Sequence, residues 1–122
     1  MRTILGISFD FHDAAAALLR DGQLVAAAQE ERFTRKKHDE GFPMNAIAYC
    51  LREAGIAMTD VDAVVYYEKP ILKFDRLLET SIRTWPMGLR SFLKAIPAWM
   101  KSKLWVKQTI QKTLDYHGPI FF

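Results

Sequence analysis

The chain has 122 residues, of which half are hydrophobic and a quarter charged, a composition typical of one globular domain that excludes wholesale disorder. No stretch approaches the roughly 20 apolar residues that a membrane-spanning helix needs, and the N-terminus lacks a secretory-signal pattern, so we expect a cytoplasmic protein. The single cysteine, Cys50, excludes an internal disulfide, and its apolar helical surroundings predict a buried thiol that serves packing.

Charge is divided unevenly along the chain. Residues 1–68 hold 7 Lys and Arg against 11 Asp and Glu, a net charge of −4, whereas residues 69–122 hold 10 against 3, a net charge of +7. A basic segment of this kind suits contact with nucleic acid, with a membrane surface or with an acidic part of the same protein.

The first elements in chain order are apolar runs around a turn. Thr3–Phe9 predicts a strand. The next run, Ala14–Arg20, is ambiguous, because alanine is the best helix former and Asp13 and Gly22 would suit the two ends of a helix. Asp21-Gly22 nevertheless stands between this run and the apolar run Gln23–Ala28, and that pattern favours a two-residue β-hairpin. We therefore predict a hairpin.

A helix and a strand follow the hairpin. Phe42-Pro43 predicts a helix start with proline in the first turn, and Gly55 predicts its end. The apolar stripe expected to face the core consists of Ile47, Leu51 and Ala54. The run from residue 61 to residue 67 predicts a buried strand that Pro70 ends. A hairpin followed by helix and strand predicts an α/β fold with a mixed sheet.

The basic part of the chain predicts helices. The helical spacing of its apolar residues is interrupted at Pro86 and Pro97. The tryptophans are expected in the core of a helical subdomain and the lysines in water; these residues are Trp85, Trp99, Trp105, Lys94, Lys101, Lys103, Lys107 and Lys112. The same pattern also suits stacking on single-stranded nucleic acid or an amphipathic helix at a membrane. Gly118-Pro119 predicts a turn, and residues 120–122 predict the start of another buried strand.

Two polar segments hold the candidate functional residues. His12 and Asp13 lie between the first two predicted strands, where an imidazole can accept a proton near neutral pH and a carboxylate can orient it or form the turn. Residues 30–39 are dense in both signs of charge, which suits either a solvated loop or contacts to an anion or polar ligand. No local metal-ligand spacing, no phosphate-binding loop with Gly-Lys-Ser/Thr, no GxGxxG and no GxSxG is present.

Taken together, these segments form a pattern that runs through about the first 40 residues. It resembles the N-terminus of the NodU/CmcH carbamoyltransferase family, whose members modify nodulation factors and antibiotics. The matching residues are Ile4-Leu5-Gly6-Ile7-Ser8, His12-Asp13-Ala14-Ala15-Ala16, Asp21-Gly22, Ala27-Ala28-Gln29-Glu30-Glu31-Arg32-Phe33-Thr34-Arg35, Lys37-His38-Asp39 and Phe42-Pro43. The chain departs from the family pattern at Ala14, often Ser, and at Gln29, often Glu.

The resemblance implies a ribonuclease-H-like, actin-like mixed sheet, opening with a β-hairpin near the nucleotide phosphates and followed by helices. It implies a reaction in which carbamoyl phosphate and ATP form carbamoyl-adenylate and the carbamoyl group passes to a hydroxyl of a small molecule. His12 would be the general base, or would orient the acceptor hydroxyl. The residues expected to contact substrate or nucleotide are Asp13, Glu31, Arg35, Lys37 and His38.

The resemblance also implies that this chain is the N-terminal part of a longer or split enzyme, inactive alone. We expect an incomplete domain with a core in residues 1–67, a basic helical insertion in residues 68–117 and the start of the next strand in residues 118–122. The ligands of a divalent metal are expected beyond residue 122, and the expected partner is the remainder of the enzyme or a partner subunit, with no nucleic acid or membrane. The alternatives are a non-catalytic relative that binds a nucleotide or a partner, and a basic helical module for nucleic acid or anionic membrane.

Overall fold

The computed structural model describes residues 1–68, 70–90, 93–94, 96–97 and 105–122. Two compact units make up the chain, one formed by residues 1–68 with 114–122 and the other by residues 69–113. The described strands all belong to the first unit, whereas the described part of the second unit is helical.

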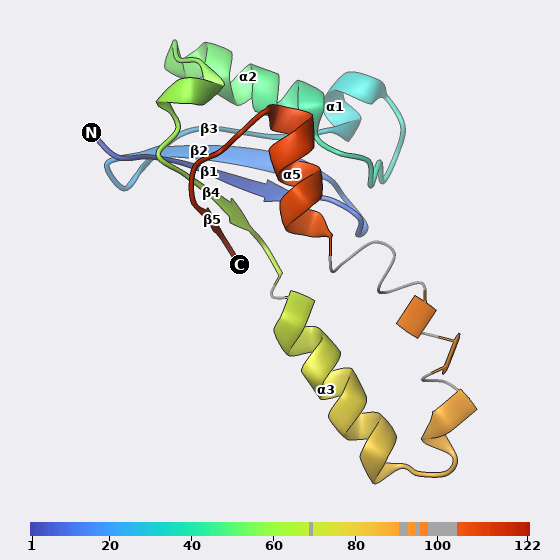
Figure 1. Cartoon of the computed structure of the whole chain (residues 1–122). Helices are drawn as coiled ribbons and strands as arrows, with labels where there is room; N and C mark the ends of the chain where they lie inside the picture. The colour runs from blue at the N-terminus through green and yellow to red at the C-terminus, as the bar shows by residue number, and fades with distance from the viewer. Residues whose placement is uncertain (69, 91–92, 95, 98–104) are drawn as a thin grey trace. The chain divides into compact units, whose positions relative to one another are not determined.

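The first unit is built on a five-stranded mixed sheet with the order β3-β2-β1-β4-β5 (Figure 1). The strands are β1 (Thr3–Ser8), β2 (Ala15–Arg20), β3 (Gln23–Gln29), β4 (Ala63–Tyr66) and β5 (Ile120–Phe121). The first three pair antiparallel, whereas β4 runs parallel to β1 and β5 parallel to β4. This arrangement confirms the mixed α/β class and the predicted opening β-hairpin.

The ambiguous alanine-rich segment is a strand, as the hairpin prediction required. Arg20 pairs with Gln23, so the loop between β2 and β3 holds two residues. Asp21 has φ 51° and Gly22 has φ 80°, and positive φ at both positions is what a type I′ turn demands. The turn and the pairing on both sides of β2 outweigh the helix propensity of alanine. A register shift follows Leu18, where the pairing with β3 is irregular.

One face of the sheet is covered by α2 (Met44–Ala54), which contacts β2 and β3. The side chains that α2 buries are Ala46, Ile47 and Cys50. The predicted stripe is therefore correct at Ile47 and wrong at Leu51 and Ala54, which are half-buried. Cys50 is fully buried, as predicted, and burial raises the pKa of its thiol.

The ends of α2 agree with the signals in the sequence. Pro43 stands at the N-cap, one position before the first helical turn. Gly55 ends the helix with φ 65°, and its backbone N–H donates to the carbonyl of Arg52. Only a residue that tolerates left-handed backbone suits this position, which explains the glycine. A short 3₁₀ turn, η1 (Met58–Asp60), leads from α2 into β4.

The unit of residues 69–113 is helical where the structure describes it. It contains α3 (Pro70–Arg83) and nearly all of α5 (Val106–Leu114), so Pro70 begins a helix rather than only ending a strand. The prediction that the tryptophans lie in a core is wrong for Trp85 and Trp105, which are 66% and 52% exposed. The predictions for Trp99, Lys101 and Lys103 lie outside the described residues. Among the described helices none is long and apolar enough to cross a membrane.

Candidate functional site

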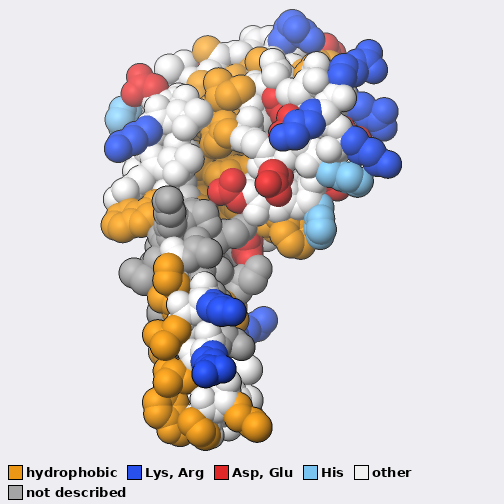
Figure 2. All heavy atoms as spheres, turned by 90° about the vertical axis from the view of Figure 1, so that its right-hand side faces the viewer, with side chains coloured by type: hydrophobic (Ala, Val, Ile, Leu, Met, Phe, Trp, Pro, Cys, Tyr) orange, Lys and Arg blue, Asp and Glu red, His pale blue; other side chains and the backbone are white. Residues whose placement is uncertain are grey.

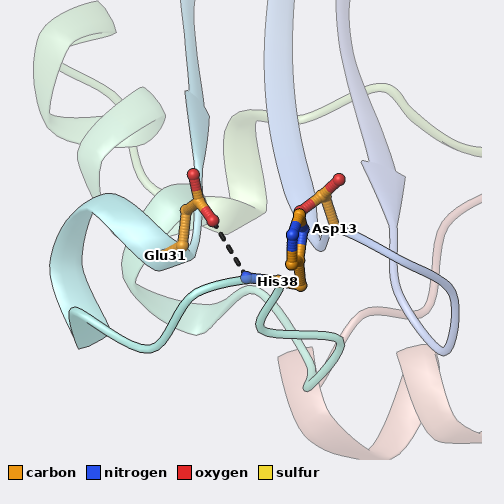
Figure 3. A group of neighbouring side chains, drawn as sticks. All are labelled: Asp13, Glu31 and His38. Atoms are coloured by element: carbon orange, nitrogen blue, oxygen red, sulfur yellow. Dashed lines mark hydrogen bonds and ion pairs between the residues drawn. The ribbon is translucent and has the colours of Figure 1, made fainter.

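Three of the predicted site residues meet at one end of the sheet, although they come from three segments of the chain. Asp13 lies in the connection between β1 and β2, Glu31 begins α1 (Glu31–Thr34), and His38 lies in the loop that follows α1 (Figure 3). Asp13 Oδ1 lies 3.0 Å from His38 Nδ1, and the backbone N–H of His38 donates to Glu31 Oε2 at 3.0 Å. These two contacts join the loop after α1 to both other segments.

Backbone hydrogen bonds hold the three segments together. The N–H of Ala14 donates to the carbonyl of Asp39 at 2.7 Å, and the N–H of Glu30 donates to the carbonyl of Ala14 at 2.8 Å. The N–H of Asp10 donates to the carbonyl of Glu40 at 2.8 Å. The loop after α1 is thereby tied along the whole connection between β1 and β2.

The backbone of this loop is strained at two positions. Arg35 has φ 60° and His38 has φ 55°. Both values lie in the left-handed region, which residues other than glycine and asparagine rarely adopt. Such conformations cost roughly 1 kcal/mol or more and persist where surrounding contacts enforce them. At His38 those contacts are the bonds to Asp13 and Glu31.

His12 stands apart from this group. It is adjacent to Asp13 in the chain, but its exposed ring packs edge-on against Phe11, with centroids 4.4 Å apart. Phe11 in turn stacks on Tyr67, which follows β4. Spacing in the sequence suggested that Asp13 orients His12; in the structure Asp13 orients His38 instead.

A basic surface adjoins the group. Arg32, Arg35, Lys36 and Lys37 all belong to α1 or the loop after it, and all are exposed. Figure 2 shows Lys and Arg side chains gathered beside histidines and carboxylates on one side of the molecule. Exposed guanidinium and ammonium groups suit the oxygens of a phosphate or carboxylate.

Two carboxylates nearby, Asp39 and Glu30, were not among the predicted site residues. The backbone N–H of Gly41, with the side chain of Thr34 and then the charge of Lys36, lowers the pKa of Asp39 below its ordinary value. Glu30 is 3% exposed and lies under the N-terminus of α2, where it accepts bonds from Asn45 and Ala46. Glu30 therefore holds the helix in place, whereas its neighbour Glu31 faces the site.

A hollow of about 740 Å³ opens on the first unit beside these residues. Its lining combines small residues of β1, β2 and β3, such as Gly6, Ala17 and Ala27, with larger ones that include Phe33 and Tyr67. Arg32 lies at its edge, so the basic surface and the hollow adjoin. The small side chains leave room for a ligand to approach the strands closely.

The first unit is thus an α/β unit whose polar edge carries exposed Arg and Lys side chains. A family model described as the carbamoyltransferase N-terminus matches residues 3–120. The chain therefore belongs to the family of carbamoyltransferase N-terminal domains, which confirms the resemblance seen in the sequence.

Similar proteins differ in how much they share with this chain. An uncharacterized protein of Synechocystis, sll1178, is 57% identical over 118 residues, which are 97% of this chain and 19% of that protein. The nodulation protein NolNO of Sinorhizobium fredii is 50% identical over 56 residues, which are 46% of this chain and 8% of that protein. The chain thus spans less than a fifth of the length of these curated relatives.

Among solved structures, YeaZ from Pseudomonas aeruginosa is similar with a TM-score of 0.43 and 22% sequence identity. The match covers 54% of this chain and 29% of that structure. A likeness at this level carries no functional argument.

Proposed function

We propose that this chain is the N-terminal part of an ATP-dependent O-carbamoyltransferase. The enzyme would convert carbamoyl phosphate, ATP and water into carbamoyl-adenylate, inorganic phosphate and pyrophosphate, and would then transfer the carbamoyl group to a hydroxyl of a small molecule in the cytoplasm. The match of the carbamoyltransferase family model over residues 3–120 is the observation that carries the proposal. The basic surface beside an open hollow supports it, because carbamoyl phosphate, ATP and the adenylate all carry phosphate oxygens.

His12 is the residue proposed to activate the acceptor. Its imidazole is exposed at the end of the two central strands, so an acceptor hydroxyl can approach it. In the transfer step the hydroxyl proton passes to the imidazole while the hydroxyl oxygen bonds to the carbamoyl carbon. The bond from that carbon to the adenylate oxygen breaks, and AMP leaves with the electron pair.

The remaining predicted residues are proposed to hold the substrates. Arg35 and Lys37 are exposed on the loop after α1, where they can contact phosphate oxygens. Asp13 and Glu31 fix the position of His38 on that same loop, so the three residues shape the site together. ATP, its divalent metal and most of the acceptor would be bound by polypeptide beyond this chain, and we expect no turnover by the 122 residues alone.

The proposal is tested in the full-length protein that contains this chain. Purified protein is incubated with carbamoyl phosphate, ATP and a panel of hydroxyl compounds, and formation of pyrophosphate and of carbamoylated product is measured. We expect the His12→Asn variant to lose roughly 10²-fold or more of the transfer rate, as is usual for a general base. His117→Asn is the matched control, because His117 is exposed and pairs only loosely with Asp115 at 3.4 Å.

The two readouts separate the proposal from its main alternative. A non-catalytic relative binds ATP or carbamoyl phosphate with no pyrophosphate formed, and its binding survives loss of His12. Pyrophosphate formation that does not need carbamoyl phosphate, or carbamoylated product formed at the wild-type rate by His12→Asn, contradicts the proposed reaction.

A further inference from the structure

The group of Asp13, Glu31 and His38 has the donor set of a divalent-cation site. Each residue offers one ligand atom, and these atoms all lie within 4.8 Å of one another. We propose that the three side chains bind a first-row transition cation of the Mn²⁺ to Zn²⁺ series. The proposal rests on geometry and donor chemistry and does not depend on carbamoyl transfer.

The spacing of the ligand atoms fits a cation. Asp13 Oδ1 and His38 Nδ1 are 3.0 Å apart. Two ligands bound about 2.1 Å from a metal and at right angles to each other are also about 3.0 Å apart. The two atoms therefore already have the separation that a shared cation requires. Glu31 has two carboxylate oxygens, so one can reach the cation while the other keeps its bond to the His38 backbone.

The ligands are positioned before any cation binds. They come from three segments that are joined by backbone bonds, such as the one from Ala14 to Asp39 at 2.7 Å. The left-handed backbone of His38, with φ 55°, turns its imidazole toward Asp13. Since the ordering of these segments is already achieved on folding, cation binding loses less conformational entropy than it would in a flexible loop.

The donor set selects the class of cation. Mg²⁺ and Ca²⁺ prefer all-oxygen shells, whereas an imidazole nitrogen suits Fe²⁺ or Zn²⁺ and the two carboxylates also suit Mn²⁺. Three protein ligands also leave coordination positions open, which is the arrangement of sites that bind an exchangeable ligand.

The basic surface beside the site leads to a second expectation, which concerns the effect of an anion on cation binding. Arg32, Arg35, Lys36 and Lys37 repel a bare cation but attract an anion. An oxyanion that completes the coordination shell would gain from both the metal and these side chains. Inorganic phosphate is therefore expected to tighten Mn²⁺ binding rather than compete with it.

The experiment uses the metal-free 122-residue chain and Mn²⁺ as the probe. Free Mn²⁺ is measured by electron paramagnetic resonance, with and without inorganic phosphate. We expect one cation per chain and at least a tenfold weaker affinity in Asp13→Asn and in His38→Asn. His117→Asn is the matched control, because it removes an exposed histidine from the other His–Asp pair, which has no third ligand among the described residues.

A second measurement does not depend on variants that could fail to fold. In ¹⁵N-labelled wild-type protein, Mn²⁺ should first broaden the NMR signals of residues 13, 31 and 38. Binding that is lost in both cluster variants and broadening centred on these residues establish the site. The proposal is overturned if millimolar Mn²⁺ and Zn²⁺ do not bind, if His38→Asn binds like wild type, or if broadening centres elsewhere.

Discussion

Replacing Glu30 by alanine should destabilise the fold more than replacing any exposed carboxylate on α2. The Glu30 carboxylate lies at the N-terminus of that helix and is 3% exposed. It accepts hydrogen bonds from the backbone and side-chain amides of Asn45, at 3.2 Å and 2.7 Å, and from the backbone of Ala46 at 2.8 Å. One side chain at the end of β3 thus satisfies helix donors that α2 cannot satisfy itself.

The loss of stability in Glu30→Ala depends on whether each N–H that bonded to Glu30 can reach water afterwards. Ala46 is fully buried, so its N–H is left without water and costs about 1–3 kcal/mol. Asn45 is exposed, so its two N–H donors can bond to water instead, and losing their bonds to Glu30 costs little free energy. The favourable interaction of the buried carboxylate with the helix dipole adds about 1 kcal/mol. We expect a total loss of about 3 kcal/mol, with Glu30→Gln intermediate because it keeps one acceptor oxygen.

The assay is urea unfolding followed by far-UV circular dichroism, with Glu53→Ala as the matched control. Glu53 is exposed on the same helix, and its replacement should change the free energy of unfolding by no more than about 0.5 kcal/mol. Equal losses in Glu30→Ala and Glu53→Ala would refute the reasoning, because burial and bonding would then contribute nothing.

Three further predictions concern the turn, the core and the buried thiol. Gly22→Ala should lower stability by about 1 kcal/mol through backbone strain at φ 80°, measured by urea unfolding, since no atom lies within 4 Å of an added methyl. Burial raises the pKa of Tyr66 far above its ordinary value. The unfolded phenol ionises near pH 10, so stability should fall as pH rises above about 10, and Tyr66→Phe should flatten that fall in an alkaline series of unfolding curves. Cys50 should react with a thiol reagent only after denaturant is added, because it is buried and its pKa is raised.

Local signals in the sequence were enough for much of the fold. The Asp21-Gly22 turn, the glycine end of α2 and the strand at residues 63–66 each depend on conformations or burial that nearby residues dictate. The stripe on α2 was only partly predicted, because its buried face also depends on where β2 and β3 lie beneath it. Exposure of Trp85 was missed because helical spacing does not show what a helix packs against.

The residues of the candidate site could be predicted from the sequence, but their pairing could not. The sequence predicted these residues from two charged or polar segments, but it paired Asp13 with His12, its neighbour in the chain. The structure pairs Asp13 with His38, 25 positions away, because the loop after α1 folds back along the connection between β1 and β2. No spacing rule for metal ligands covers residues that come from three segments, so a cation site of this kind leaves no local signal in the sequence.

The strand order also sets a sequence of events during synthesis on the ribosome. By residue 29 the chain can complete a three-stranded antiparallel meander, in which β1 occupies an edge. That edge stays open until residues 63–66 emerge, and β4 then becomes the new edge until residue 120 is made. Each addition extends the same side of the sheet, so the open edge on that side moves outward, whereas β3 stays the edge on the other side. A chaperone that limits aggregation of this protein would act at that moving edge.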